Sequence, residues 1–281
     1  MSLWSHQEEA LKLYDPIFQC SRVVQAGFDP CVGVQGYLAL ALLCLGFPDR
    51  ALAQSNAAIA EAWRLANPPS LAVGLLVGAR LFSLFGDNAA LDERAGELIA
   101  VAIEQGFPYW RTLGTAYRGP QSKMATRWRG FRCFGSVRPL TVPPGQRRGC
   151  PKLSRLLAGA CEIAGQIEEA LILLDEASQM IERTEERWFA TELYRHRGQL
   201  LLRQGHSEAA EELYCKALSI AQDQEAKLWE LRAAVSLARP RRDQGRRAEA
   251  HDLLAPVYYW FTEGFDTPDL KESRALLGEL S

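Results

Sequence analysis

The chain has 281 residues, a formal net charge of −2 and a sequence pI near 6.2, so its overall charge gives no reason to expect a nucleic-acid or anionic-membrane partner. Its seven cysteines contain no C-x-x-C pair, which argues against zinc or disulfide frameworks and favours buried free thiols in a reducing compartment. The N-terminus lacks a signal-peptide pattern, and no run reaches roughly 18 uninterrupted apolar residues, so we expect a cytoplasmic protein without a membrane span.

The first 118 residues show a helical pattern. An amphipathic helix is expected over 4–19, as the second helix of a truncated repeat. Two helical hairpins follow, each with a glycine at the turn between its two helices. The predicted helices of these hairpins are 31–44 with 50–66, and 71–85 with 91–105. A further first helix begins near Tyr109 and ends at about Arg118.

Residues 119–152 differ from the rest, because they hold five prolines and eight basic residues, no acidic residue and no helical period. One interpretation is a basic loop around Arg127 to Arg132 that contacts RNA or another polyanion. The hypothesis we favour is a frameshift, because codons read one base earlier place a glycine at position 125, where the repeat requires one. It needs two compensating base changes, near 119–122 and near 151–155.

Residues 153–266 return to the helical pattern as three hairpins, and 267–281 are predicted to form a capping helix. The predicted helices of the hairpins are 153–164, 167–182, 187–204, 207–222, 227–243 and 247–262. Tryptophans lie near the starts of three first helices, at Trp110, Trp188 and Trp229. Because an indole ring buries a large apolar area, we expect these side chains to anchor neighbouring repeats.

One pattern recurs about every 40 residues through most of the chain. The turn glycines are Gly46, Gly86, Gly165, Gly205 and Gly245. Five positions later stand Ala51, Leu91, Ala170, Ala210 and Ala250, and seven positions before the glycines stand Ala39, Ala79, Ala158, Gly198 and Ala238. Antiparallel helices approach closely where side chains are small, so the pattern predicts stacked hairpins in an all-α solenoid.

This spacing of small residues resembles the tetratricopeptide repeat over five units, although each unit is about six residues longer than usual. The resemblance implies a right-handed superhelical solenoid that acts as a protein-interaction module. Three stretches, Phe28–Ser55, Ala102–Trp110 and Lys227–Leu270, also resemble the C-terminal repeat region of large bacterial signalling proteins. In that family a class III nucleotide cyclase domain and an AAA-type ATPase domain precede the repeats.

No catalytic motif is visible in the sequence. There is no Gly-Lys dipeptide and hence no P-loop, and the histidines, which have no metal-ligand spacing, are interpreted as solvated or turn residues: His6, His196, His206 and His251. We therefore expect a non-catalytic protein with no cofactor and no metal. Two alternatives stay open: a fragment that contributes to cyclase or ATPase activity, favoured by an upstream P-loop, and the repeat module of a transcriptional activator, favoured by a neighbouring helix-turn-helix.

The first helices of such repeats line a concave surface. In the C-terminal half the register places there Arg155, Glu162, Glu192, Arg195, Gln199, Arg232, Arg239 and Arg242. The corresponding N-terminal positions are apolar: Leu40, Leu43, Val73 and Leu76. The net basic half predicts a groove for an acidic or C-terminal peptide, with a solvated basic face as the alternative. The pattern identifies neither the partner protein nor the oligomeric state.

Overall fold

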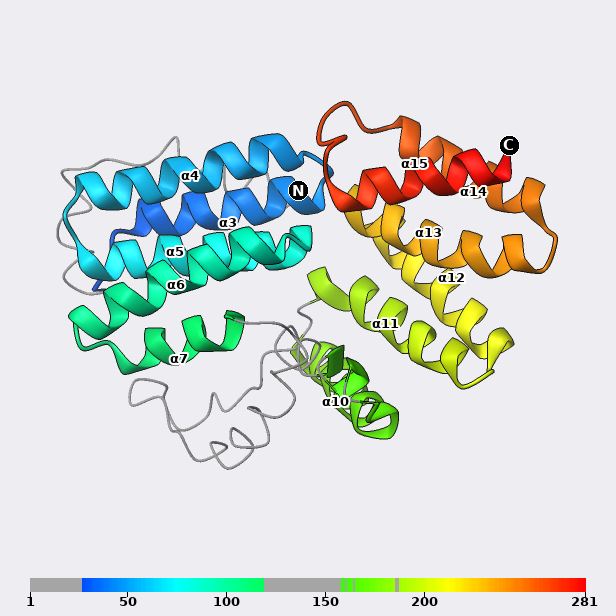
Figure 1. Cartoon of the computed structure of the whole chain (residues 1–281), viewed down its shortest axis with the longest axis horizontal. Coiled ribbons are helices and arrows are strands. Elements are labelled where there is room, and N and C mark those ends of the chain that lie inside the picture. Colours follow the sequence, from blue (N-terminus) through cyan, green and yellow to red (C-terminus); the bar gives the residue numbers. More distant parts are fainter. Residues whose placement is uncertain (1–26, 119–157, 160, 164, 185–186) are drawn as a thin grey trace. The chain divides into compact units, whose positions relative to one another are not determined.

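A computed structural model describes residues 27–118, 158–159, 161–163, 165–184 and 187–281 (Figure 1). Within these ranges the regular structure is helical and no strand occurs, which confirms the all-α prediction. The helix expected over 4–19 and the atypical segment 119–152 lie outside the described residues. Two compact units divide the chain: the first contains 27–118 and 261–270, and the second contains the described residues from 158 to 260 and 271–281.

Two helical hairpins and one further helix make up most of the first unit. Its helices are α3 (Pro30–Cys44), α4 (Pro48–Arg64), α5 (Pro68–Phe85), α6 (Asn88–Glu104) and α7 (Pro108–Tyr117). They begin one to three residues earlier than predicted, and four of the five carry proline in the first turn. Proline suits this place because the N–H that it lacks would have no partner within the helix.

The second unit continues the pattern of paired helices. Its helices are α10 (Ile167–Thr184), α11 (Ala190–Arg203), α12 (Ser207–Asp223), α13 (Lys227–Asp243), α14 (Arg247–Tyr259) and the larger part of α15 (Pro268–Leu280). The prediction of one helix over 187–204 is wrong in its first three residues, which form the tighter 3-10 turn η2 (Arg187–Phe189) common at helix starts. The helix predicted over 247–262 ends three residues early, where the chain leads into the turn at Gly264 (φ 76°).

Residues in the left-handed region end helices in both units. The five predicted turn glycines have φ between 74° and 92°. Gly205 N–H donates to the Leu202 carbonyl and His206 N–H to the Leu201 carbonyl, both at 3.0 Å, so two otherwise unpaired carbonyls are satisfied. Ala66 (φ 48°) and Glu225 (φ 54°) have the same backbone conformation at turns between hairpins. The local geometry is thus shared even where glycine is absent.

Small buried residues line the contact between the two helices of each hairpin. All of the following have an exposed fraction of 0%: Ala39, Ala51, Ala79, Ala158, Ala170, Ala210, Ala238 and Ala250. A methyl side chain lets two helix backbones approach closely without leaving a void. At Gly198 even a methyl group would not fit, because an added Cβ would lie 2.7 Å from the Tyr214 ring.

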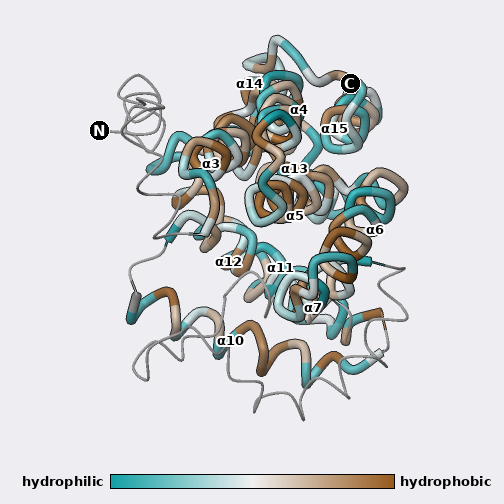
Figure 2. The backbone as a smooth tube through the Cα atoms, turned by 90° about the vertical axis from the view of Figure 1, so that its left-hand side faces the viewer, coloured by the Kyte–Doolittle hydropathy of each residue, from teal (hydrophilic) through white to brown (hydrophobic). Residues whose placement is uncertain are grey.

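The first helices α3 and α5 are apolar around most of their circumference, as the brown colour of α5 in Figure 2 shows. Leu43 is 1% exposed and Leu76 is 5% exposed, so these predicted concave positions are core residues. Among the described residues, only the helix α5 has the length and the apolar composition that a membrane span requires. Yet 67% of its 18-residue apolar stretch is buried inside the structure. Such burial is typical of a helix in a protein core.

The described cysteines are free thiols in different surroundings. Cys31 and Cys161 are buried, and Cys44 is partly buried. Burial raises the pKa of Cys31 to about 11, with smaller contributions from the carboxylates of Asp29 and Glu61. The prediction of buried thiols is wrong for Cys215, because it lies on the solvent side of the amphipathic helix α12.

Candidate functional site

The candidate site is the first-helix face of the second unit, which comprises one side of the helical residues 158–159 and 161–163, of α11 and of α13. Residues three, four or seven apart share one side of a helix. That spacing holds for Glu192, Arg195 and Gln199 on α11 and for Arg232, Arg239 and Arg242 on α13. The helices α11 and α13 contact each other within this unit. Arg155, the remaining predicted groove residue, lies outside the described residues.

A buried carboxylate joins the two helices at the inner part of this face. Glu192 has an exposed fraction of 0%, and its Oε1 accepts a hydrogen bond from Arg195 Nε at 2.7 Å. Its Oε2 accepts from Arg195 Nη2 at 3.1 Å and from Arg232 Nη1 at 3.4 Å. A buried carboxylate left without cations would be strongly destabilising. The first role of Arg195 and Arg232 is therefore to neutralise Glu192 across two repeats.

A second buried contact connects α11 to the preceding first helix. His196, which is 3% exposed, donates from Nε2 to Glu162 Oε2 at 2.7 Å. Arg203 Nη1 lies 3.0 Å from Glu162 Oε1, and Gln199 Nε2 lies 3.4 Å from the same atom. The interpretation of the histidines as solvated or turn residues is wrong for His196, because it faces a carboxylate of the neighbouring repeat and not solvent.

The other histidines differ from His196. His206 is exposed and immediately precedes α12. The side chain of His251 is 42% exposed and lies 3.5 Å from Asp252 Oδ1. His6 lies outside the described residues. In the part of the chain that the structure describes, no group of three His, Cys, Asp or Glu side chains is placed to hold a metal ion.

The outer part of the face is more exposed and pairs with α15. Arg239 forms an ion pair with Glu272, and Arg242 forms one with Glu279 and another with Asp243 at 2.8 Å. The side chain of Arg239 is 50% exposed and that of Arg242 is 29% exposed. Hydrogen bonding to Asp243, and to a smaller extent to Glu279, raises the pKa of Arg242 above its usual range. We call these two arginines the Arg239–Arg242 pair.

Each arginine of the predicted groove that the structure describes therefore has a carboxylate partner. The sequence pattern placed Glu162 and Glu192 on the same surface, but it did not pair them with particular cations. It missed the partners on α15, Glu272 and Glu279, altogether. Their spacing of seven residues is the signal that could have indicated one acidic side of the capping helix.

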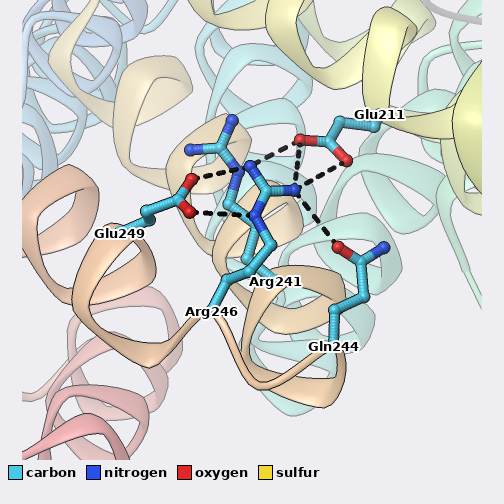
Figure 3. A network of polar contacts seen from close by, with 5 residues as sticks. All are labelled: Glu211, Arg241, Gln244, Arg246 and Glu249. Carbon is cyan, nitrogen blue, oxygen red and sulfur yellow. Dashed lines mark hydrogen bonds and ion pairs between the residues drawn. The ribbon is translucent and has the colours of Figure 1, made fainter.

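Polar contacts at the turn between α13 and α14 lie outside this face (Figure 3). The Glu211 carboxylate on α12 accepts from Arg241 Nε at 3.1 Å and from Arg246 Nη1 at 3.3 Å. Arg246 also donates from Nη2 to Glu249 at 2.6 Å and from Nη1 to Gln244 at 3.2 Å. Hydrogen bonding between Arg246 and Glu249 raises the pKa of the arginine and lowers that of the carboxyl group. The network connects the turn at Gly245 to the preceding hairpin.

One aromatic contact joins neighbouring repeats among the described residues of the second unit. Trp229 is 0% exposed and meets the Phe189 ring edge-on, with centroids 5.8 Å apart. Trp188, predicted as an anchor, is only partly buried and packs against Phe189 at 5.1 Å. The fully buried anchor next to Trp229 is therefore Phe189. Trp110, the third predicted anchor, is partly buried and contacts Tyr109 at 5.4 Å.

Residues 151–223 match the family model described as tetratricopeptide repeat. This match supports a tetratricopeptide repeat region. The matched range contains α10, α11 and α12, and so it includes five of the eight residues predicted for the first-helix face. The tetratricopeptide hairpin also accounts for the paired helices and small buried residues of the second unit.

Other comparisons show only distant similarity. No curated protein matches this chain at a significant level. Among solved structures, one of kinesin light chain nearly identical TPR-like repeats from Podosopora anserina shares 19% identity at a TM-score of 0.33, covering 79% of this chain and 91% of that chain. A second structure of these repeats shares 18% identity at a TM-score of 0.32, covering 87% and 94%. At these TM-scores neither structure supports a functional argument.

Proposed function

We propose that this chain is a non-catalytic protein-interaction module whose first-helix face in the second unit binds an acidic segment of a partner protein. Tetratricopeptide repeats are generally interaction scaffolds, and the family match supports a repeat region in this unit. The observation that carries the proposal is a row of guanidinium groups on neighbouring first helices: Arg195, Arg232, Arg239 and Arg242. Guanidinium groups bind carboxylates with two parallel hydrogen bonds, which gives both strength and geometric specificity.

The proposed surface has an inner and an outer part with different roles. Arg195 and Arg232 support the buried Glu192 carboxylate, so their charge is largely compensated within the protein. The Arg239–Arg242 pair is more exposed and provides the first contact for an incoming carboxylate. Gln199 extends the proposed binding surface along α11. The partner segment is therefore expected to carry several carboxylates.

A peptide-binding measurement tests this proposal. Fluorescein-labelled octaglutamate is titrated with the full chain at low ionic strength, with octaglutamine as the uncharged control, and anisotropy is recorded. We expect binding of octaglutamate alone, weakened by salt because exposed charges are screened. Replacing both outer arginines (Arg239→Gln with Arg242→Gln) is expected to weaken binding at least about fivefold.

A matched variant separates the site from net charge. Arg183→Gln with Arg247→Gln removes the same charge from second helices, at two exposed positions, and is expected to bind octaglutamate like the unmodified protein. Equal losses of octaglutamate affinity in the two double variants would show that overall charge, and not the proposed site, causes the binding. Absence of octaglutamate binding at low salt would contradict the acidic-partner proposal.

The proposed cellular context is a cytoplasmic bacterial signalling protein with an ATPase domain and a class III nucleotide cyclase domain encoded upstream. This context rests on the sequence resemblance of Phe28–Ser55, Ala102–Trp110 and Lys227–Leu270. The DNA upstream tests it: a P-loop and a cyclase signature in the same reading direction would support the context. An unrelated upstream gene would contradict it.

The same DNA tests the frameshift proposed for residues 119–152. Codons for an alanine- and leucine-rich helix in the shifted frame would support it. Stop codons throughout that frame would contradict it and would assign the basic segment to the protein itself. This outcome is independent of the binding proposal, because the outer arginines of the site lie more than one repeat further along the chain.

A further inference from the structure

Two carboxylates on α15 already occupy the arginines to which the proposed function assigns an acidic partner. Glu272 forms an ion pair with Arg239, and Glu279 forms one with Arg242. The two glutamates are seven residues apart, so they project from the same side of α15 about two helical turns from each other. The chain thus contains an acidic helix side whose spacing suits the Arg239–Arg242 pair.

These ion pairs are open to exchange because water reaches all four side chains. The exposed fractions are 50% for Arg239, 44% for Glu272, 29% for Arg242 and 56% for Glu279. Exposed ion pairs contribute little to stability, since solvent and salt screen them and long side chains lose entropy when they are held. Glu192 differs, because its carboxylate is fully buried and its arginines are only 18% and 14% exposed. Only the outer arginines are placed to change partners.

The helix itself stays docked when these side chains exchange. Leu276, Leu277 and Leu280 are 4%, 7% and 7% exposed, and Ser273 is 0% exposed. Burial of the three leucines holds α15 in place independently of its carboxylates. An incoming acidic segment therefore needs to displace the two α15 carboxylates and not the helix, while Asp243 on α13 is a further partner of Arg242.

We propose that Glu272 and Glu279 act as an internal competitor that lowers the affinity of the Arg239–Arg242 pair for an acidic segment of a partner protein. The inference rests on the proposed function, since it concerns the regulation of the same site. It implies selectivity: a segment with one carboxylate gains little by displacing the internal partners. A segment that places two or more carboxylates along this face replaces both ion pairs.

The test compares the unmodified full chain with a variant whose α15 lacks the two carboxylates that face the Arg239–Arg242 pair. Glu272→Gln with Glu279→Gln is expected to raise the affinity for fluorescein-labelled octaglutamate about fivefold at low ionic strength, and added salt is expected to reduce the gain. The matched control is Glu208→Gln with Glu212→Gln, which removes the same charge from exposed positions on α12. A further variant, Glu272→Asp with Glu279→Asp, keeps a carboxylate at both positions. Its affinity for octaglutamate is expected to lie close to that of the unmodified protein.

The outcomes distinguish this inference from the proposed function. If the unmodified protein binds octaglutamate through Arg239 and Arg242 but the α15 variant shows no gain beyond the control, the internal competitor is wrong and the binding site stands. If octaglutamate binds none of the variants, the acidic-partner proposal itself fails. Tighter binding of a dT12 oligonucleotide than of octaglutamate by every variant would also overturn the assignment to a protein segment. Thermal melts of all variants check that α15 remains folded.

Discussion

The first helices of the two units bury different kinds of side chain. In the first unit, neither α3 nor α5 buries a charged residue, and helix contacts rely on close approach at glycine. An added Cβ at Gly36 would lie 3.1 Å from Val77, and one at Gly74 would lie 3.3 Å from Ile59. In the second unit, α11 buries Glu192 and α13 buries Glu230, both of which pair with cations.

The comparison of the two units shows which structural features they share and which features differ between them. Both units share left-handed turn residues and buried alanines, because two antiparallel helices cannot pack closely without them. The other faces of the first helices can be apolar or charged. In the second unit, Glu192 and Arg232 connect neighbouring repeats. Neighbouring repeats of the second unit therefore rely on each other for charge neutralisation as well as for packing.

The largest expected effect comes from removing the carboxylate that is fully buried on the first helix α11 of the second unit. Glu192→Ala leaves Arg195 and Arg232 without their shared carboxylate, and breaking such a buried pair costs about 3–5 kcal/mol of unfolding free energy. Chemical denaturation followed by circular dichroism measures the loss. Native-state hydrogen exchange should locate it in α11 and α13, with the amides of α3 and α5 unaffected.

The matched control is Glu208→Ala, on the exposed side of α12. It is expected to change stability by less than about 0.5 kcal/mol. Equal effects of the two substitutions would show that the Glu192 contacts do not hold the repeats together. Equal loss of protection in both units would contradict the separation of the two regions.

Alkaline pH provides a second comparison, because a group with a raised pKa is buried in the described part of each unit. Burial raises the pKa of Tyr214 to about 12, partly opposed by Arg195 and Arg239, and raises that of Cys31 to about 11. When folding raises the pKa of such a group, the stabilisation from keeping it protonated is fully present below its unfolded-state pKa. This stabilisation is lost as the pH rises toward the folded-state pKa. We expect losses of up to about 2–3 kcal/mol per group, between pH 9 and 11 for Cys31 and between pH 10 and 12 for Tyr214.

Urea titrations at steps of one pH unit measure these slopes. Cys31→Ala should flatten the lower window alone, and Tyr214→Phe should flatten the upper window alone. A slope between pH 10 and 12 that persists in Tyr214→Phe would show that other groups cause the alkaline loss.

Local pattern explains which features the sequence predicted. The turn glycines and the small residues between the two helices of a hairpin are required by contacts within that hairpin. The positions of Gly205 and Ala210 could therefore be predicted from sequence spacing alone. His196 and Glu272 could not, because their positions depend on which carboxylate or cation a different helix presents. The residue type shows that a side chain is polar or charged. It does not show whether another helix provides the oppositely charged or hydrogen-bonding partner that allows the side chain to be buried.

The third prediction concerns a helix contact that differs from the equivalent contacts in other repeats. Gly198 stands where other repeats have alanine, and Tyr214 fills the space, being 2% exposed and packed with Ala210 and Leu237. Gly198→Ala should destabilise the second unit by about 1–3 kcal/mol through overpacking. Thermal or chemical denaturation measures this loss.

A double-mutant cycle then tests the cause. Leucine occupies the position equivalent to Tyr214 in the flanking repeats, at Leu174 and Leu254, both 0% exposed. Adding Tyr214→Leu to Gly198→Ala should therefore recover part of the loss, with a coupling of about 0.5–3 kcal/mol. Strict additivity of the two substitutions would show that the ring does not set the glycine requirement.

The fourth prediction tests the turns that the two units share. Gly86→Val in the first unit and Gly205→Val in the second place a branched side chain at φ 75° and φ 86°, with no atom within 4 Å of the added Cβ. The cost is therefore backbone strain, about 1–2 kcal/mol in each unit. Similar decreases in melting temperature are expected. An unchanged melt for Gly205→Val would contradict the assignment of this residue as the repeat turn.

The smallest expected effect has the opposite sign. Ala66 and Glu225 take φ values of 48° and 54°, which glycine adopts without strain. Ala66→Gly and Glu225→Gly should each stabilise by about 0.5–1 kcal/mol, since relief of strain exceeds the entropy that glycine adds to the unfolded chain. Gly substitution in a helix interior, at exposed Glu212, is the control and should destabilise by about 1 kcal/mol. Because the two turns lie in different units, equal gains would show that turn geometry is independent of first-helix chemistry. A gain in one unit alone would show that packing around that turn, and not the backbone conformation, determines its stability.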